Sequence, residues 1–241
     1  MNRKLLTVAL TLTACAPAPP LIEGVTLTMN PNESAPLAGV LQYSADLSVR
    51  PRFTLSSEGE EDIVVTDAPA NASGPTPLLG MRADREYTVS VSFEPEAGGA
   101  AVPGGDFTLT TPPLPDDFPP IEVTTIRPAR MEPGYQFVPT MRWTKRGPDR
   151  EFGLVFALDA AGEVVWYFRT DKSVNDVKRL PNGDLIYLAG RDGRMVQINK
   201  LGELVKHWHT TGIPKDDLPE GSIPVDCDTF HHDFVLMDNG D

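Results

Sequence analysis

The sequence has no long apolar segment, no stretch of helical apolar periodicity and only two cysteines among its 241 residues. The mostly apolar residues 5–13 are much too few to span a bilayer, which needs ~20 apolar residues. The lack of helical periodicity, together with 24 prolines and 20 glycines, favours a β-rich chain with many turns. The length allows one or two domains.

Basic residues are also scarce, with 21 Lys and Arg against 34 Asp and Glu and a net charge of −13. Removal of residues 1–14 would take away Arg3 and Lys4 and no acid, so that the charge would change from −13 to −15. A chain of this charge does not offer the basic face that binds a phosphate backbone. We therefore expect no nucleic-acid partner.

The N-terminus is typical of an export signal, because Arg3 and Lys4 precede the short apolar stretch. Residues 12–15, Leu-Thr-Ala-Cys, resemble the bacterial lipobox. The resemblance implies that residues 1–14 are a signal peptide, that Cys15 is lipidated, and that residues 15–21 are a disordered tether. An ordinary signal peptide with an incidental cysteine is the alternative.

Alanine rather than aspartate follows Cys15, which resembles outer-membrane sorting in Gram-negative bacteria. We therefore expect an exported periplasmic or cell-surface lipoprotein, anchored in the outer membrane. Lipidation of Cys15 would leave Cys227 as an odd thiol, and its partner would lie in sequence beyond residue 241.

Residues 22–111 predict short strands separated by turns. In "REYTVSVSFEP" Tyr87, Val89, Val91 and Phe93 alternate with polar residues, the pattern of a half-buried strand. Strands of this length predict a β-sandwich. "LLGMRADREYTVSVSF" resembles a corner of fibronectin type III and other immunoglobulin-like sandwiches, with Leu79 and Tyr87 at the matching places. In such a tyrosine corner the hydroxyl bonds back to the backbone.

Residues 112–121 contain five prolines and predict a semi-rigid linker. The following residues 122–241 contain a repeat, because "LDAAGEVVWYF" and "INKLGELVKHW" place Gly162 and Gly202 in equivalent turns. Between them, Asn182-Gly183 predicts a hairpin turn, with φ > 0 expected at both positions. Together with the turns at residues 190–193 and Gly202, this hairpin predicts four antiparallel strands. This is the anatomy of a propeller blade.

A third repeat begins at "HDFVLMDNGD", after an insertion at residues 210–229 that predicts a loop over one face. The chain is therefore interpreted as a propeller truncated in its third repeat, since closed propellers have about four to eight blades. A complete, open β-meander is the alternative, but it would leave a bare edge strand.

The second region resembles the bacterial aryl-sulfate sulfotransferase family. The matching segments are "MEPGYQFVPTMRW", "GLVFALDAAGEVVWYFR", "RLPNGDLIYL" and "FHHDFVLMDNGD". The resemblance implies a six-bladed propeller after a small β-sandwich. It also implies sulfuryl transfer from an aryl sulfate to a phenol through an enzyme histidine, with no nucleotide sulfate donor and no cofactor.

The resemblance places His231 and His232 among the groups that support sulfate binding and the transition state, with one of the two reaching the substrate. It places the nucleophilic histidine in a later blade, and the family's arginine matches no arginine of this sequence. Alternation in a strand would put His231 with Asp233 on one face and His232 with Phe234 on the other. A purely structural role for both histidines is the alternative.

Other polar residues have plainer interpretations. His207 and His209, with Cys227, Asp228, His231 and His232, could be read as metal ligands, but their spacing matches no tight metal motif, and we expect no metal. Arg179, Arg191 and Arg194 flank turns and are interpreted as solvated.

Two functions remain from the sequence. The first is an exported aryl sulfotransferase with small-molecule partners and a lipid anchor, inactive as this fragment alone. The second is a non-catalytic propeller lipoprotein that binds a protein partner or a ligand. A homo-oligomer is left open for both.

Overall fold

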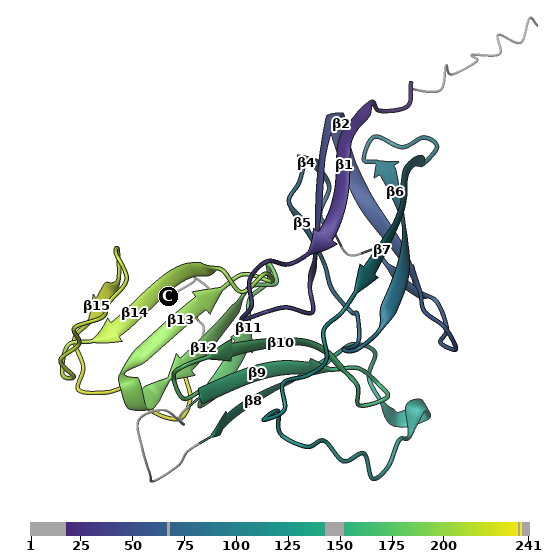
Figure 1. Cartoon of the computed structure of the whole chain (residues 1–241). Helices are drawn as coiled ribbons and strands as arrows, with labels where there is room; N and C mark the ends of the chain where they lie inside the picture. Colours follow the sequence, from purple (N-terminus) through teal and green to yellow (C-terminus); the bar gives the residue numbers. More distant parts are fainter. Residues whose placement is uncertain (1–17, 67, 143–151, 236, 238–241) are drawn as a thin grey trace, which may run out of the picture.

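The computed structural model describes residues 18–66, 68–142, 152–235 and 237. These residues form fifteen strands in three sheets, with only two short 3-10 helices, Pro128–Arg130 and Gly190–Asp192 (Figure 1). The predicted all-β class is therefore confirmed. Within this described part of the chain, no helix has the length and apolar character needed to cross a membrane.

The first sheet has the strand order β1-β2-β6-β7, with three short strands also paired to β2. It curls into a half-barrel, so that its edge strands β1 and β7 contact each other. Because hydrogen bonds join all seven strands, the predicted sandwich of two sheets is not confirmed. The strands are β1 (Ile22–Met29), β2 (Gly39–Ser56), β3 (Ile63–Val65), β4 (Asn71–Ser73), β5 (Thr76–Leu78), β6 (Glu86–Pro95) and β7 (Val102–Thr110).

The prediction of short strands separated by turns is wrong for residues 39–56, because they form the single unbroken strand β2. Its first half pairs with β1 and β5, and its second half pairs with β6 and β3. Pro51 lies opposite Phe93 within this second half. One long strand that changes partners lets a single sheet curl around its own core.

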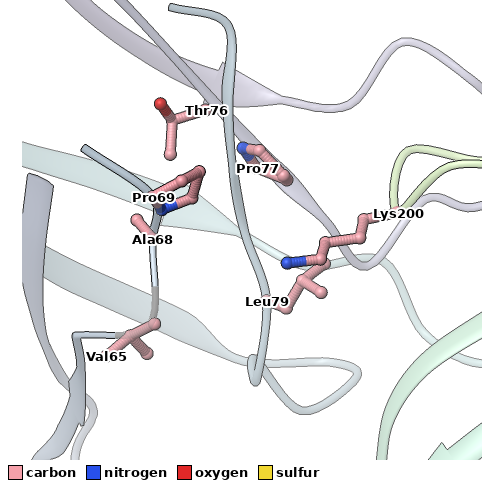
Figure 2. Close-up of a pocket in the computed structure, with 7 residues that line it drawn as sticks. All are labelled: Val65, Ala68, Pro69, Thr76, Pro77, Leu79 and Lys200. Atoms are coloured by element: carbon pink, nitrogen blue, oxygen red, sulfur yellow. The ribbon is translucent and has the colours of Figure 1, made fainter. Parts of the chain in front are cut away.

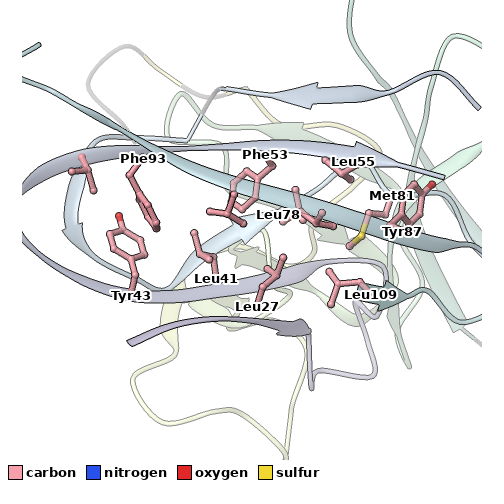
Figure 3. Close-up of a cluster of buried hydrophobic side chains, with 13 residues drawn as sticks. Leu27, Leu41, Tyr43, Phe53, Leu55, Leu78, Met81, Tyr87, Phe93 and Leu109 are labelled. Atoms are coloured by element: carbon pink, nitrogen blue, oxygen red, sulfur yellow. The ribbon is translucent and has the colours of Figure 1, made fainter. Parts of the chain in front are cut away.

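The core of the half-barrel confirms the predicted alternation in β6. Tyr87, Val89, Val91 and Phe93 are buried, whereas the residues between them are more exposed (Figure 3). The predicted tyrosine corner is also confirmed, because the backbone N–H of Arg82 donates to the Tyr87 hydroxyl at 2.9 Å.

Two further sheets follow in the second half of the chain. The three-stranded sheet has the order β10-β9-β8, and the five-stranded sheet has the order β11-β12-β13-β14-β15. The four predicted antiparallel strands of the second repeat are confirmed as β11–β14. The strands are β8 (Gln136–Arg142), β9 (Phe152–Leu158), β10 (Val164–Thr170), β11 (Asp176–Arg179), β12 (Leu185–Ala189), β13 (Arg194–Ile198), β14 (Leu204–Thr210) and β15 (Ile223–Val225).

The repeated turns have the same local structure. The N–H groups of Gly162, Gly183 and Gly202 each donate to the carbonyl three residues earlier, at 3.0, 2.9 and 2.9 Å. The prediction that both Asn182 and Gly183 have φ > 0 is wrong, because only the glycine does. The Asn182 side chain instead accepts a hydrogen bond from the Asp184 N–H at 3.1 Å, which closes the turn in another way.

The loop between β1 and β2 docks the first sheet on the other two. Ala35 is fully buried among side chains of β9, β10, β12 and β13. The side-chain amides of Asn30 and Asn32 both donate to the Leu201 carbonyl, at 3.0 and 2.9 Å. This carbonyl lies in the turn before β14, so the loop holds that turn against the first sheet.

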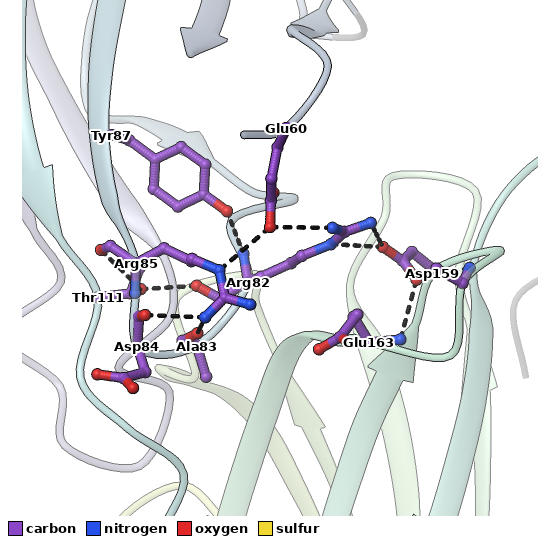
Figure 4. A network of polar contacts seen from close by, with 10 residues as sticks. Glu60, Arg82, Ala83, Asp84, Arg85, Tyr87, Thr111, Asp159 and Glu163 are labelled. Atoms are coloured by element: carbon purple, nitrogen blue, oxygen red, sulfur yellow. Dashed lines mark hydrogen bonds and ion pairs between the residues drawn. The ribbon is translucent and has the colours of Figure 1, made fainter. Parts of the chain in front are cut away.

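A polar network makes a second contact between the first sheet and β9–β10 (Figure 4). The Arg82 guanidinium donates to Asp159 at 2.8 and 2.9 Å and is paired with Glu60 at 3.2 Å. The other Asp159 oxygen accepts from the Ala161 and Glu163 N–H groups. The same carboxylate therefore shapes its own turn and binds the first sheet.

The segment predicted as a linker packs closely rather than acting as a spacer. The Phe118 ring lies edge-on to Phe156 and Tyr167, with ring centroids 5.3 and 5.7 Å apart. Asp117 pairs with both terminal nitrogens of Arg169, at 2.8 and 3.0 Å. These contacts fix the proline-rich segment on β9 and β10.

We predict that Gly202→Ala destabilises the protein through the β1–β2 loop. A Cβ atom there would lie 2.9 Å from the Ala35 Cβ, and the backbone has φ +76°. The left-handed conformation costs ~1–2 kcal/mol, and crowding adds ~1–3 kcal/mol. Gly221→Ala is the matched control, because Gly221 has the same φ and nothing within 4 Å.

Urea unfolding of both variants measures the difference. Gly202→Ala should lower the free energy of unfolding by at least ~1 kcal/mol more than Gly221→Ala does. Equal losses would show that the loop does not crowd this turn.

Candidate active site

The predicted lipidation residue, Cys15, lies outside the described residues. The predicted catalytic pair, His231 and His232, is described, but the prediction of a strand there is wrong. Residues 230–235 belong to no strand. In space these residues lie beside the turn at residues 190–193. The Thr229 hydroxyl, directly before them, donates to the Gly190 carbonyl of this turn at 3.3 Å.

Both imidazoles of this pair are exposed. Their ring centroids are 3.9 Å apart and their planes are nearly perpendicular, at 85°. In the described part of the chain neither ring is hydrogen-bonded to a carboxylate. Two adjacent rings with exposed nitrogens can donate hydrogen bonds to one anionic ligand.

The neighbouring Asp233 pairs with a residue of β11. Its carboxylate lies 2.7 Å from the Lys178 ammonium, which also contacts Asp176 at 3.0 Å. Hydrogen bonds from Lys178 lower the pKa of Asp233, and the same carboxylates raise the pKa of Lys178. The ammonium therefore offsets part of the negative charge next to the histidines.

Two other histidines meet at a serine that sequence reasoning did not single out. The Nδ1 atoms of His207 and His209, on β14, both lie 2.7 Å from the Ser222 hydroxyl. One hydroxyl proton can serve only one ring, so the second ring must donate its own Nδ1–H to the oxygen. The i and i+2 spacing of the two histidines puts them on one face of β14, but nothing in the sequence indicated the serine.

The insertion at residues 210–229 lies mostly outside strands, as the predicted loop would, but it also contributes the short parallel strand β15. Trp208, His209 and Thr210 pair with Ile223, Pro224 and Val225. The Ser222 contact lies directly before β15, so it fixes the insertion to the edge of the sheet.

The interpretation of Arg194 as a solvated residue is also wrong. Its side chain is buried and its guanidinium pairs with Asp217 of the insertion. This guanidinium lowers the pKa of the Asp217 carboxyl. Arg194 directly follows the turn at residues 190–193, whose Gly193 carbonyl accepts from the Thr210 N–H at 2.9 Å. The same turn thus contacts the segment before His231 and His232 and the end of β14, the strand that carries His207 and His209.

The described residues contain no group of three or more His, Cys, Asp or Glu side chains placed to hold a metal ion. The alternative set of six ligands from the sequence is therefore not brought together in this part of the chain.

We predict a pH-dependent stability from His207. Burial, then the nearby Arg194 and His209, lower the pKa of His207 below its ordinary 6.5, and Lys215 acts in the same direction while Asp217 opposes it. Because the unfolded chain takes up this proton at higher pH than the folded chain, the free energy of unfolding should fall as the pH drops through 6.5, until the folded pKa is passed.

Urea unfolding across this range measures the effect. His207→Gln should flatten the dependence, whereas Lys206→Gln, an exposed neighbour on β14, should keep it. An unchanged dependence in His207→Gln would contradict the assignment.

Comparison with known proteins bears on the same part of the chain. No curated protein matches this sequence. A family model described as arylsulfotransferase (ASST) matches residues 124–241, which contain β8–β15 and both histidine groups. Through these residues, about half of its length, the chain belongs to the arylsulfotransferase family.

Proposed function

We propose that this sequence belongs to an aryl-sulfate sulfotransferase in which His231 and His232 bind the sulfate group of the substrate. The observation that carries the proposal is the pair of exposed, adjacent imidazoles within the region that matches the family. Nearly perpendicular rings can direct donors to two different oxygens of one sulfate.

The reaction proceeds in two displacements. In the first, a neutral imidazole nitrogen attacks the sulfur of the aryl sulfate, a nitrogen–sulfur bond forms, and the bond from sulfur to the aryl oxygen breaks to release a phenolate. In the second, the oxygen of an acceptor phenol attacks that sulfur, its proton passes to a base, and the nitrogen–sulfur bond breaks. No redox change and no nucleotide donor is required.

His231 and His232 act as hydrogen-bond donors to the sulfuryl oxygens in this scheme, where fixed donors lower the barrier. The contact between Lys178 and Asp233, 2.7 Å long, supports the role because an unpaired carboxylate beside the pair would repel a sulfate. The nucleophilic histidine and a further arginine come from other blades, so residues 1–241 alone are inactive.

We also propose the architecture that this site requires. The sheet β11–β14 is one blade of a six-bladed propeller, and the half-barrel is the sandwich-like domain before it. The equivalent turns at Gly162 and Gly202 support a repeating unit. In this arrangement β11 is the inner strand, so its neighbour, the His231–His232 segment, lies at the mouth of the channel.

The protein is proposed to be an exported lipoprotein, attached through Cys15 to the outer membrane. Aryl sulfates and phenols reach an enzyme in the periplasm or on the cell surface. A non-catalytic lipoprotein that binds a partner is the second candidate, and a measurement of sulfuryl transfer separates the two.

In the full-length protein that contains this sequence, we predict that His231→Asn or His232→Asn lowers sulfuryl transfer from 4-nitrophenyl sulfate to phenol by ~10²-fold, the typical effect of one lost transition-state donor. His209→Asn, an imidazole in the Ser222 group, should keep the rate within about threefold. Release of nitrophenolate is followed by its absorbance. Wild-type rates in both variants would contradict the site, and no transfer by the wild type would favour the binding protein.

Lipidation of Cys15 is predicted separately. Expressed with its leader in a Gram-negative host and labelled with radioactive palmitate, the protein should carry label in the membrane fraction. Cys15→Ala should lose the label, and Cys227→Ala should keep it. Label in Cys15→Ala would refute the anchor.

A further inference from the structure

We infer that the junction of the three sheets binds a small amphipathic anion, with a flat aromatic body and one carboxylate or sulfonate group. The site is a cavity of about 510 Å³, within the size range of pockets that hold small molecules. It is separate from the His231–His232 segment and does not rest on the proposed sulfuryl transfer.

The walls come from all three sheets. Val64 and Leu79 belong to the half-barrel side, Phe137 and Trp166 to β8 and β10, and Lys200 to the turn before β14. A smaller cavity of about 30 Å³ adjoins this site and shares Val65, Leu79 and Lys200 with it (Figure 2). The cavity therefore lies where the three sheets meet.

The aromatic side chains define the body of the ligand. Phe137 and Trp166 pack edge to face with ring centroids 6.2 Å apart, and Tyr135 lies on the same wall. Tyr135 and Val64 are 52% and 48% exposed, so large apolar groups reach solvent at this cavity. An apolar ring placed here would cover them, and edge-to-face contacts favour an aromatic ring.

The charged side chains define the anionic group. A Cβ atom built on Gly183 would lie 3.0 Å from the Lys200 Nζ and 3.6 Å from an Arg179 terminal nitrogen, so the two cations converge on one point. Among the described residues that line the cavity there is no Asp or Glu. In the described part of the chain neither cation has an ion-pair partner.

The acid that adjoins Gly183 in the chain has other partners. Asp184 follows Gly183, but its carboxylate accepts hydrogen bonds from Gln197 and Asn182, at 2.7 and 2.9 Å. Two converging cations without a carboxylate are unexpected in a chain of net charge −13. A bound anion would relieve their mutual repulsion, and a guanidinium can bind a carboxylate or sulfonate through two hydrogen bonds.

The test uses the full chain and 2-naphthoate, with 2-naphthamide as a neutral ligand of the same shape. By calorimetry 2-naphthoate should bind with a Kd below about 1 mM, within reach of a ligand of this size, and 2-naphthamide roughly tenfold more weakly. Binding should also raise the melting temperature, because it favours the docked sheets.

Variants locate the charge. Arg179→Gln with Lys200→Gln should remove the preference for 2-naphthoate. Lys206→Gln with Arg127→Gln, which deletes the same charge at exposed positions outside the cavity, should keep it. Neither pair lies in a buried core, so both should fold.

Nuclear magnetic resonance locates the ligand. The Trp166 indole N–H donates to the Lys200 carbonyl at 3.0 Å, so its signal should shift on binding, whereas that of Trp208 on β14 should not. The inference is overturned if 2-naphthoate fails to bind, if both double variants bind it as the wild type does, or if the Trp166 signal stays in place.

Discussion

The docking of the first sheet on the other two centres on one carbonyl group, that of Leu201. Two amide side chains of the β1–β2 loop donate to it, while Ala35 of the same loop fills the space among β9, β10, β12 and β13. A buried carbonyl must be hydrogen-bonded, and here its donors come from residues about 170 positions earlier in the chain. Together with the Arg82–Asp159 pair, the loop thereby joins elements that lie far apart in the chain.

Other features of the molecule follow from this docking. The turn that carries Leu201 also provides Lys200, whose carbonyl accepts from the Trp166 indole and whose ammonium lines the cavity at the junction. Asp159, in the equivalent turn of the preceding repeat, binds Arg82 of the half-barrel. The repeated turns therefore have two functions. The Asp159 and Asn199 side chains close their own turns, and the Asp159 carboxylate and the Leu201 carbonyl bind the first sheet.

Much of the local structure was predictable because it depends on short-range physics. The alternation around Tyr87, the tyrosine corner and the Asp- or Asn-led glycine turns all follow from side-chain period and turn chemistry. Where partners lie far away in sequence, prediction failed: the single strand β2, the buried Arg194 beside Asp217 and the packed Phe118 each depend on elements distant along the chain. The hydroxyl of Ser222 between two histidines belongs to the same class.

The sequence by itself determined that the chain is all-β, that the second repeat has four antiparallel strands, and which family the second region, residues 122–241, resembles. These features depend on local pattern and motif. Only the tertiary structure decided that the first seven strands form one curled sheet, that His231 and His232 lie exposed beside Lys178 rather than in a strand, and that Arg179 and Lys200 converge. The physical reason is that long-range packing decides which strands pair and which charged side chains come close together. The residues that adjoin each position in the sequence do not specify this packing.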